Sequence, residues 1–368
     1  VTAMNVDDYV SVNRKVLKLV GLYPINFLRY IISTGCILVI VIPQILLIYR
    51  DWRDLTIVLE TSSVLFTILL AIFKSMVWVF KRRSIEPFIN YMLTDYWQIV
   101  SKSDASRHMQ IYAKYAKQVT KGYFFLICNA LLFFFSLPMT DVLITMIKGT
   151  VDNGTKRFPF VALYPTEFYH FPFYEIVYAS QMIATVTCGI VILATDSLIA
   201  TALFHTCGHF KILKQDIKNL DTTIIHLQMA RIIKHHQIIL WFCDNLEENF
   251  NPMLLLQMLA SSLIICLVGL QVSTKSKLIK YSSYLAMALF QLLLFCFPGD
   301  MLIHQVIIEF QKYTENVHSK VCMLILRSKR PCCVTAGKFY IMHLENFTIL
   351  STALSYFMML RSFNSNES

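Results

Sequence analysis

Seven apolar segments, each long enough to cross a lipid bilayer as a helix, constrain the fold more than any other feature of this sequence. A membrane-spanning helix needs about 20 mostly apolar residues. Hydrophobic residues make up 56% of the 368 and charged residues only 15%, against roughly 25% in a soluble domain. We therefore expect an all-α bundle of seven transmembrane helices in a multi-pass plasma-membrane protein. The expected spans are residues 27–49, 57–80, 121–147, 175–205, 254–273, 281–303 and 338–361.

Lysine and arginine are divided unevenly between the two sides of this bundle. One side holds 23 of them, in the N-terminal part up to Arg29 and in residues 81–121, 206–251 and 302–338. The other side holds 9, and the last, Lys74, lies inside the second span. Because lysine and arginine accumulate in cytoplasmic loops, we expect an inverted topology with the N-terminus in the cytoplasm and the C-terminus outside. The net charge of +10 then fits a basic face beside anionic lipid, with no nucleic acid as partner.

Glycosylation sequons agree with this orientation. Asn153 begins an Asn-Gly-Thr sequon in the third loop, and Asn366 begins an Asn-Glu-Ser sequon in the tail. Both places are predicted to be extracellular, where asparagine can be glycosylated. A third sequon, at Asn346, falls in the last span, where we expect it to be silent. Residues 1–26 are polar and lack the apolar core of a cleaved signal peptide, so the first span is expected to direct insertion.

Enzyme, metal and cofactor signals are weak. His205 and His209 are four apart but lack the glutamate of a zinc hydrolase helix, and the ten cysteines show no metal-ligand spacing. The sequence offers no glycine-rich phosphate loop. We therefore expect no enzymatic activity, no metal and no cofactor.

The predicted cytoplasmic connections have the periodicity of amphipathic helices. Apolar residues recur at helical spacing between Lys211 and Phe250, which predicts an extension of the fourth span below the bilayer. The segment from Ile303 to Leu326 has the same character. These helices predict a cytoplasmic packing domain, used either for subunit assembly or for packing within one chain.

The most specific local pattern precedes the last span. A basic run from Arg327 ends at Pro331, which stops a helix, and is followed by Thr-Ala-Gly-Lys-Phe at 335–339, where Gly337 permits a tight turn. The span then ends near Ser-Tyr-Phe at 355–357. This arrangement resembles the C-terminal signature of insect odorant receptors. The proline- and aromatic-rich loop before span four, with Phe160, Tyr164 and Phe173, is similar to the lid of that family.

The resemblance implies a divergent odorant-binding subunit of a ligand-gated, non-selective cation channel in the dendrite of a sensory neuron. Such a subunit is expected to form a heterotetramer with a shared co-receptor subunit. Cations would pass through a central pore lined by span seven. Met359 and Phe363 fall where the extracellular gate of the family is narrowest. The implied organisation is a cytoplasmic segment 1–26, spans one to four in 27–205 with the lid 149–174, a cytoplasmic extension 206–253, spans five and six in 254–303, an anchor 304–337 and the pore span 338–363.

A small volatile organic ligand would bind in the outer half of the bundle, where a mostly apolar cavity needs a few polar groups. Tyr281 and Tyr284 open span six three residues apart, on one helix face, and resemble aromatic pocket residues of the family. The other candidates are the rings, hydroxyls and thioethers of the outer parts of spans two, three and four. They are Ser62, Leu65, Phe66, Leu69, Phe133, Ser136, Leu137, Thr140, Tyr178, Met182 and Val186.

Charged residues inside the membrane are costly and mark structural or functional sites. For Asp196 we expect a hydrogen bond between helices, and for Lys74 and Glu345 snorkelling or a structural ion pair. Asp141 is a candidate for attracting cations or contacting the ligand.

Three other classes of protein are compatible with parts of the sequence. A gustatory-type chemoreceptor channel shares the topology but has a different pattern of aromatic residues and glutamine in its last span. A G-protein-coupled receptor requires the opposite orientation. A secondary transporter is expected to have internal repeats or broken helices, and the spans show neither.

Overall fold

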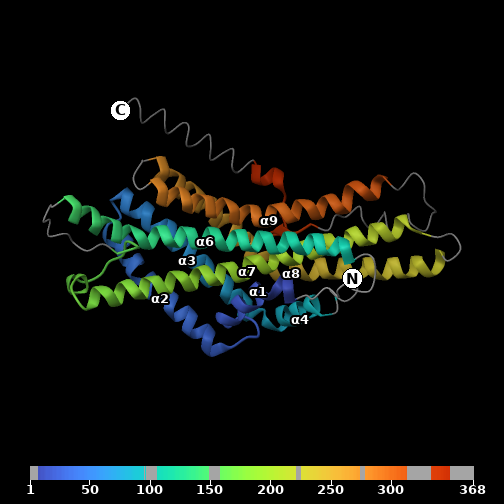
Figure 1. Ribbon diagram of the computed structural model, residues 1–368, viewed down its shortest axis with the longest axis horizontal. Helices are drawn as coiled ribbons and strands as arrows, with labels where there is room; N and C mark the ends of the chain where they lie inside the picture. Colours follow the sequence, from blue (N-terminus) through green and yellow to red (C-terminus); the bar gives the residue numbers. More distant parts are fainter. Residues whose placement is uncertain are drawn as a thin grey trace, which may run out of the picture.

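The computed structural model describes residues 7–94, 96, 106–148, 158–220, 225–273, 278–312 and 333–348. Within them the chain is almost entirely helical, as the composition predicts (Figure 1). The elements are α1 (Asp7–Leu19), α2 (Phe27–Arg50), α3 (Leu55–Phe80), α4 (Arg82–Leu93), α6 (Ser106–Lys148), the 3-10 helix η1 (Thr166–Tyr169), α7 (Phe173–Lys218), α8 (Ile225–Ser273), α9 (Leu278–Lys312), β1 (Thr335–Ala336) and β2 (Tyr340–Ile341).

Six of the described helices are long and apolar enough to cross a membrane. They are α2, α3, α6, α7, α8 and α9, and each contains one of the first six predicted spans. The helical-bundle fold class is therefore confirmed. Most of the predicted seventh span lies outside the described residues, and its described end, 344–348, is helical.

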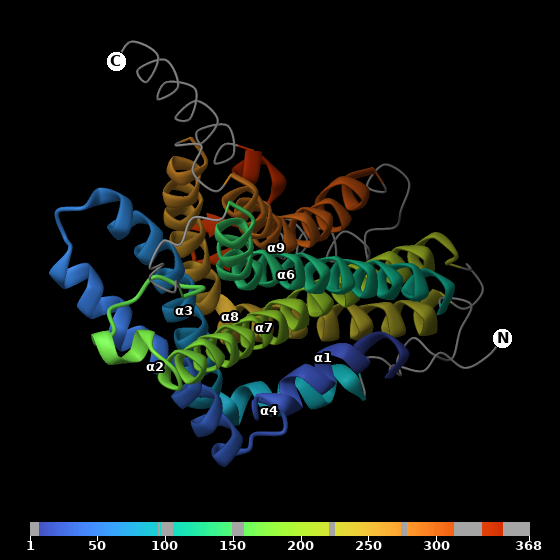
Figure 2. The same cartoon turned by 60° about the vertical axis from the view of Figure 1, so that its left-hand side comes forward.

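Long helices that follow each other in the chain run in opposite directions, so the two sides predicted from charge fall at opposite ends of the bundle (Figure 1). The α2–α3 connection, the segment before α7 and the start of α9 lie at the left end of Figure 1, which is the outer end. The end of α7, the start of α8 and the end of α9 lie at the right, cytoplasmic end. Figure 2 shows α1 and α4 together on one side of α7, toward that cytoplasmic end.

Side-chain caps fix where the first two membrane helices begin. The Asn26 side chain accepts a hydrogen bond from the backbone N–H of Arg29 at 3.1 Å, at the start of α2. Asp54 caps α3 in the same way, accepting from Thr56 at 3.0 Å and from Ile57 at 3.3 Å. Such caps satisfy N–H groups that have no partner within the helix. The short connection between the two helices makes them antiparallel neighbours.

The helices α6, α7, α8 and α9 continue well below the predicted spans, and the cytoplasmic extension is thus helical. It is not one helix, however. The predicted helix from Lys211 to Phe250 is interrupted, because α7 ends at Lys218 and α8 begins at Ile225. Asn219 and residues 221–223, which are Asp-Thr-Thr, are of types whose side chains hydrogen-bond the backbone readily and favour helix ends over helix interiors.

The end of α7 and the start of α8 pack on each other, and aromatic rings, including that of Tyr96, fill the space between them. His209 Nδ1 of α7 lies 3.0 Å from His235 Nε2 of α8. Tyr96 stacks on Phe242 with ring centroids 4.2 Å apart, and on His209 at 3.8 Å. Packing within one chain therefore accounts for much of the apolar periodicity of this region.

The Thr-Ala-Gly-Lys-Phe motif forms a β-hairpin, which corrects the predicted start of span seven at 338. Ala336 pairs with Tyr340, and both Gly337 (φ 67) and Lys338 (φ 66) occupy the left-handed region, so no helix can pass through them. Asn251 of α8 donates to the backbone carbonyl of Thr335 at 2.8 Å and anchors the hairpin. Helix resumes only at residue 344.

Candidate functional site

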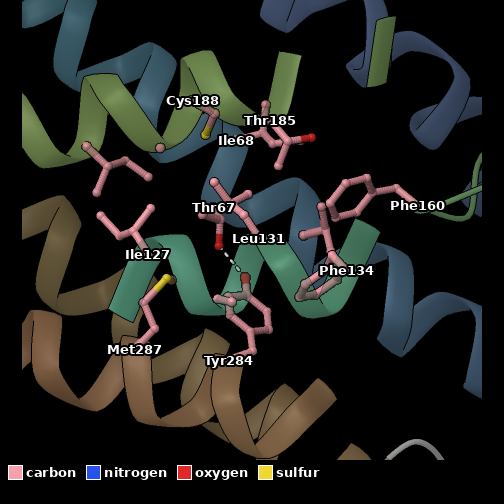
Figure 3. Close-up of a pocket in the computed structure, with 14 residues that line it drawn as sticks. Thr67, Ile68, Ile127, Leu131, Phe134, Phe160, Thr185, Cys188, Tyr284 and Met287 are labelled. Carbon is pink, nitrogen blue, oxygen red and sulfur yellow. Dashed lines mark hydrogen bonds between the residues drawn. The ribbon is translucent and has the colours of Figure 1, made fainter. Parts of the chain in front are cut away.

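A cavity lies in the outer half of the bundle, lined by α3, α6, α7, α9 and the loop before α7 (Figure 3). Its volume is about 70 Å³, counted as the space that the centre of a water-sized molecule can occupy. One water needs roughly 10–15 Å³ on this measure, so the cavity has room for more than a single water. Its lining is almost wholly apolar. The lining residues are Val64, Thr67, Ile68, Ile127, Ala130, Leu131, Phe134, Phe160, Thr185, Cys188, Gly189, Ile192, Tyr284 and Met287.

Each helix contributes one face to this cavity. On α7 the lining residues recur at intervals of three and four, from Thr185 to Ile192, which is the spacing of one helix face. Gly189 brings α6 and α7 close together, since a Cβ at this position would lie 3.2 Å from Cγ2 of Ile127. The absence of a side chain at Gly189 therefore allows α6 to pack closely on α7 and leaves space for the cavity beside it.

One hydrogen-bonded pair of hydroxyls supplies the polarity of the cavity. Tyr284 and Thr67 hydrogen-bond across the gap between α9 and α3 (Figure 3). Tyr284 Oη lies 3.0 Å from the backbone oxygen of Ser63, and Thr67 Oγ1 lies 3.2 Å from the same oxygen. The hydroxyl of Thr185, in contrast, donates to the carbonyl of Gln181 in its own helix at 2.6 Å. The hydroxyl pair is therefore the one place among the lining residues where donors of two helices converge.

Stacked rings line the outer end of the cavity. Phe160, from the loop, stacks on Phe134 with centroids 4.9 Å apart and planes inclined by 17°. Tyr284 meets Phe134 edge-on at 5.7 Å. The ammonium of Lys280 lies 4.4 Å from the Phe134 centroid and is paired with Glu60 at 2.8 Å. Phe134 is thus held by an aromatic ring of the loop and by a cation–π contact.

The loop that carries Phe160 is itself well fixed. Leu163 donates its backbone N–H to the carbonyl of Pro43 in α2 at 3.0 Å. Phe158 stacks on Tyr174 at the start of α7, with centroids 5.0 Å apart. Burial raises the pKa of the Tyr164 hydroxyl, which lies 3.3 Å from the side-chain nitrogen of Gln181. This loop is the described part of the predicted lid.

A buried polar cluster lies one helical turn below the cavity. Lys74 of α3 forms an ion pair with Asp196 of α7, and the two side chains are 1% and 0% exposed. Tyr123 donates to the Asp196 carboxylate at 3.2 Å and Gln291 donates to it at 2.8 Å. Gln257 of α8 accepts from Lys74 as well. The hydrogen bonds between helices expected for Asp196 are therefore confirmed, and Lys74 is paired and does not snorkel.

The structure brings only part of the predicted ligand-binding set to the cavity. Tyr284 lines it, and Tyr281 is buried beside Lys280 at its outer rim. Phe66, Leu69 and Val186 are exposed at the bundle surface. Ser62, Leu65, Phe133, Ser136, Tyr178 and Met182 are described but are not among the lining residues.

The cavity lies between the four helices from which the candidate ligand contacts were drawn, but most of the candidates lie on other faces of those helices. In a membrane protein the face toward lipid is as apolar as the face toward a cavity, so hydrophobicity does not distinguish Leu69 from Ile68. Prediction from the sequence missed Thr67, Phe134 and Thr185, and the lid phenylalanine Phe160 was noted only as part of a motif. The side chains of Leu137, Thr140 and Asp141, and the residues Asn153, Met359 and Phe363, lie outside the described part of the structure.

Metal binding finds no support in the part of the chain that is described. No three histidine, cysteine, aspartate or glutamate side chains gather there in a way that could hold a metal ion.

Comparison with known proteins identifies the family. The model described as 7tm Odorant receptor matches residues 54–354, most of the chain. The chain belongs to the seven-transmembrane odorant receptor family. It is thus a multi-pass membrane protein, and its family is one of receptors and not of enzymes.

Individual relatives of this odorant receptor agree. It is 31% identical to Odorant receptor 13a of Drosophila melanogaster over 263 residues, which cover 61% of this chain and 62% of that receptor. The chain therefore spans about three fifths of the length of that relative. Odorant receptor Or2 of Anopheles gambiae is 21% identical over 355 residues, covering 89% of this chain and 90% of that receptor.

A solved structure shows the same fold. The insect olfactory receptor OR5 from Machilis hrabei, in complex with eugenol, superposes with a TM-score of 0.78 at 13% identity. The superposition covers 96% of this odorant receptor and 97% of that chain.

Proposed function

We propose that this odorant receptor binds a small, largely uncharged, volatile organic ligand in the cavity beneath Phe160. The observation that supports this most directly is an apolar cavity between four helices and the loop, with a single convergent pair of hydroxyls, Thr67 and Tyr284. Apolar walls bind hydrocarbon through burial of surface, and the hydroxyls select an oxygen-bearing group and its position. The olfactory receptor of the same fold was solved with eugenol, which supports a ligand of similar size here.

The hydroxyl pair has to rearrange when such a ligand binds. Both hydroxyls lie within hydrogen-bond distance of the Ser63 carbonyl, so one donates to it and the other donates to its partner hydroxyl. A ligand oxygen competes for one of these protons. The net value of such an exchange is about 0.5–1.5 kcal/mol, or roughly 2- to 12-fold in affinity. The hydroxyls therefore contribute selectivity, and the apolar walls contribute most of the affinity.

We further propose that ligand binding opens a non-selective cation channel formed with co-receptor subunits, with span seven as the pore wall. The route from cavity to pore is short. Tyr284 and Met287 line the cavity from α9, and further along the same helix Gly299 meets the carbonyl of Met342, just before residues 344–348. From Tyr284 to Gly299 is roughly 22 Å at a helical rise of 1.5 Å per residue. A displacement of α9 by the ligand would thus reach the start of span seven directly.

Current recordings test this function. The receptor is co-expressed with the co-receptor subunit and exposed to an odorant panel, and a cation current that does not depend on G protein is expected. Thr67→Val and Tyr284→Phe should each raise the half-maximal concentration of an alcohol or carbonyl ligand by roughly 2- to 12-fold. They should leave the response to a hydrocarbon of the same skeleton nearly unchanged.

Leu69→Ala, at the bundle surface on the same helix as Thr67, serves as the matched control and should respond like wild type. Absence of current across the panel, with surface expression demonstrated, would contradict the channel. Equal sensitivity of the alcohol and hydrocarbon responses to Tyr284→Phe would contradict the role given to the hydroxyls.

A further inference from the structure

Gln181 and Phe160 together determine the outer limit of the cavity. We propose that Gln181 is a positioning residue that fixes Phe160 and thereby sets the maximum length of ligand that the cavity accepts. This inference rests on the proposed function, since it assigns a specificity determinant to the same cavity. Neither residue was a predicted ligand contact.

The side-chain amide of Gln181 forms hydrogen bonds with both the backbone N–H and the backbone carbonyl of Phe160. Its side-chain oxygen accepts from the Phe160 N–H at 3.1 Å, and its side-chain nitrogen donates to the Phe160 carbonyl at 3.2 Å. Only an amide side chain carries a donor and an acceptor in this arrangement. Gln181 is 1% exposed, so replacing it with an apolar residue would leave both backbone groups of Phe160 without this partner away from water.

The position of Gln181 on α7 explains how its effect reaches the cavity. It lies four residues before Thr185, which lines the cavity, and therefore stands on the same helix face one turn further out. Phe160, held in front of it, is 4% exposed and is the one lining residue that a loop contributes. Figure 3 shows its ring beside Phe134 at one end of the cavity.

The other walls have less freedom to move. Below the cavity, the Lys74 and Asp196 cluster ties α3, α6, α7, α8 and α9 together through buried hydrogen bonds. At the outer end, Phe134 is held by Lys280 of α9, which is paired with Glu60 of α3. The ring of Phe160 thus forms the one boundary whose position depends on a loop, and the loop is fixed at this point by Gln181.

A double-mutant cycle tests whether Gln181 acts through Phe160. The variants are Phe160→Ala, Gln181→Leu and the two combined, assayed with straight-chain alcohols of increasing length. Binding is followed both as current and as ligand-induced thermal stabilisation of the purified receptor, which does not require channel opening.

Phe160→Ala should move the preferred alcohol to longer chains, with each newly accommodated methylene binding about fourfold more tightly. Gln181→Leu should shift the preference in the same direction by a smaller amount. The combined variant should equal Phe160→Ala, because a positioning residue has no further effect once the ring that it positions is gone. Phe160→Trp should move the preference to shorter chains.

Ile183→Ala, an exposed position two residues further along α7, is the control and should leave the chain-length preference unchanged. Additive effects of the two substitutions, or equal weakening of every alcohol by Gln181→Leu, would overturn the inference. If Gln181→Leu does not reach the surface, the opposite shifts of Phe160→Ala and Phe160→Trp still test the size limit, and their absence would overturn it.

The outcomes also separate this inference from the proposed function. If Thr67→Val changes alcohol binding while the Phe160 and Gln181 variants keep the wild-type preference, the inference fails and the ligand site stands. If the wild-type receptor is stabilised by none of the alcohols and by nothing in the odorant panel, the proposed function fails.

Discussion

At the scale of single residues, Gly299 of α9 lies against the backbone of Met342, in the segment that leads into span seven. A Cβ built at this position would lie 2.2 Å from the carbonyl oxygen of Met342, a contact that backbone atoms cannot relieve cheaply. Gly299→Ala is therefore expected to displace the hairpin, to cost about 1–3 kcal/mol of stability and to abolish most of the ligand-evoked current. Thermal unfolding of the purified receptor and current recordings measure the two effects.

Gly35 provides the matched control for this prediction. It is also a helical glycine, but a Cβ there would have no atom within 4 Å. Gly35→Ala should leave the current unchanged and stabilise α2 slightly, by up to about 1 kcal/mol, because alanine is the better helix former. Identical behaviour of the two variants would show that the contact between Gly299 and Met342 does not couple the bundle to span seven.

At the scale of the elements, the cluster around Lys74 and Asp196 connects five helices in the middle of the bundle. Lys74→Met leaves the Asp196 carboxylate buried without its ion-pair partner, and such a loss costs about 3–5 kcal/mol. The double variant Lys74→Met, Asp196→Leu removes both charges and should recover much of this stability, because burying either charge is itself costly. The unfolding temperatures of the wild-type receptor and of these two purified variants measure the difference.

An exposed ion pair sets the reference for this comparison. Arg50 and Asp51 lie 2.8 Å apart at the surface, so Asp51→Asn should not change the unfolding temperature measurably. If the double variant of the buried pair is no more stable than Lys74→Met, the cost comes from lost packing and not from an unpaired charge.

The elements also show how much of the site was predictable. The lengths of the apolar runs placed the spans, so the four helices around the cavity could be predicted. Which face each helix turns inward could not, since lipid and cavity both select apolar residues. The partnership of Lys74 with Asp196 joins residues far apart in the chain, and the hairpin at Tyr340 lies within a run that reads as apolar helix. Both depend on tertiary packing.

At the scale of the whole molecule, the orientation in the membrane follows from charge alone. The bundle places residues 81–94, the end of α7 and the start of α8 at one end, and these parts are rich in lysine and arginine. Because insertion keeps such segments in the cytoplasm, an epitope tag placed before Val1 should be detected only after the membrane is permeabilised. The loop that contains Asn153 should face outward, so a glycosidase-sensitive mobility shift should be lost in Asn153→Gln.

The two measurements depend on opposite faces of the membrane and therefore test the orientation independently. Asn346→Gln is the control for glycosylation, since Asn346 donates to the Ile341 carbonyl beside the hairpin and its sequon should not be modified. A tag that is accessible on intact cells would reverse the orientation. It would then place the cavity beneath Phe160 on the cytoplasmic side, where an airborne ligand dissolved in the extracellular fluid could not reach it without first crossing the bilayer.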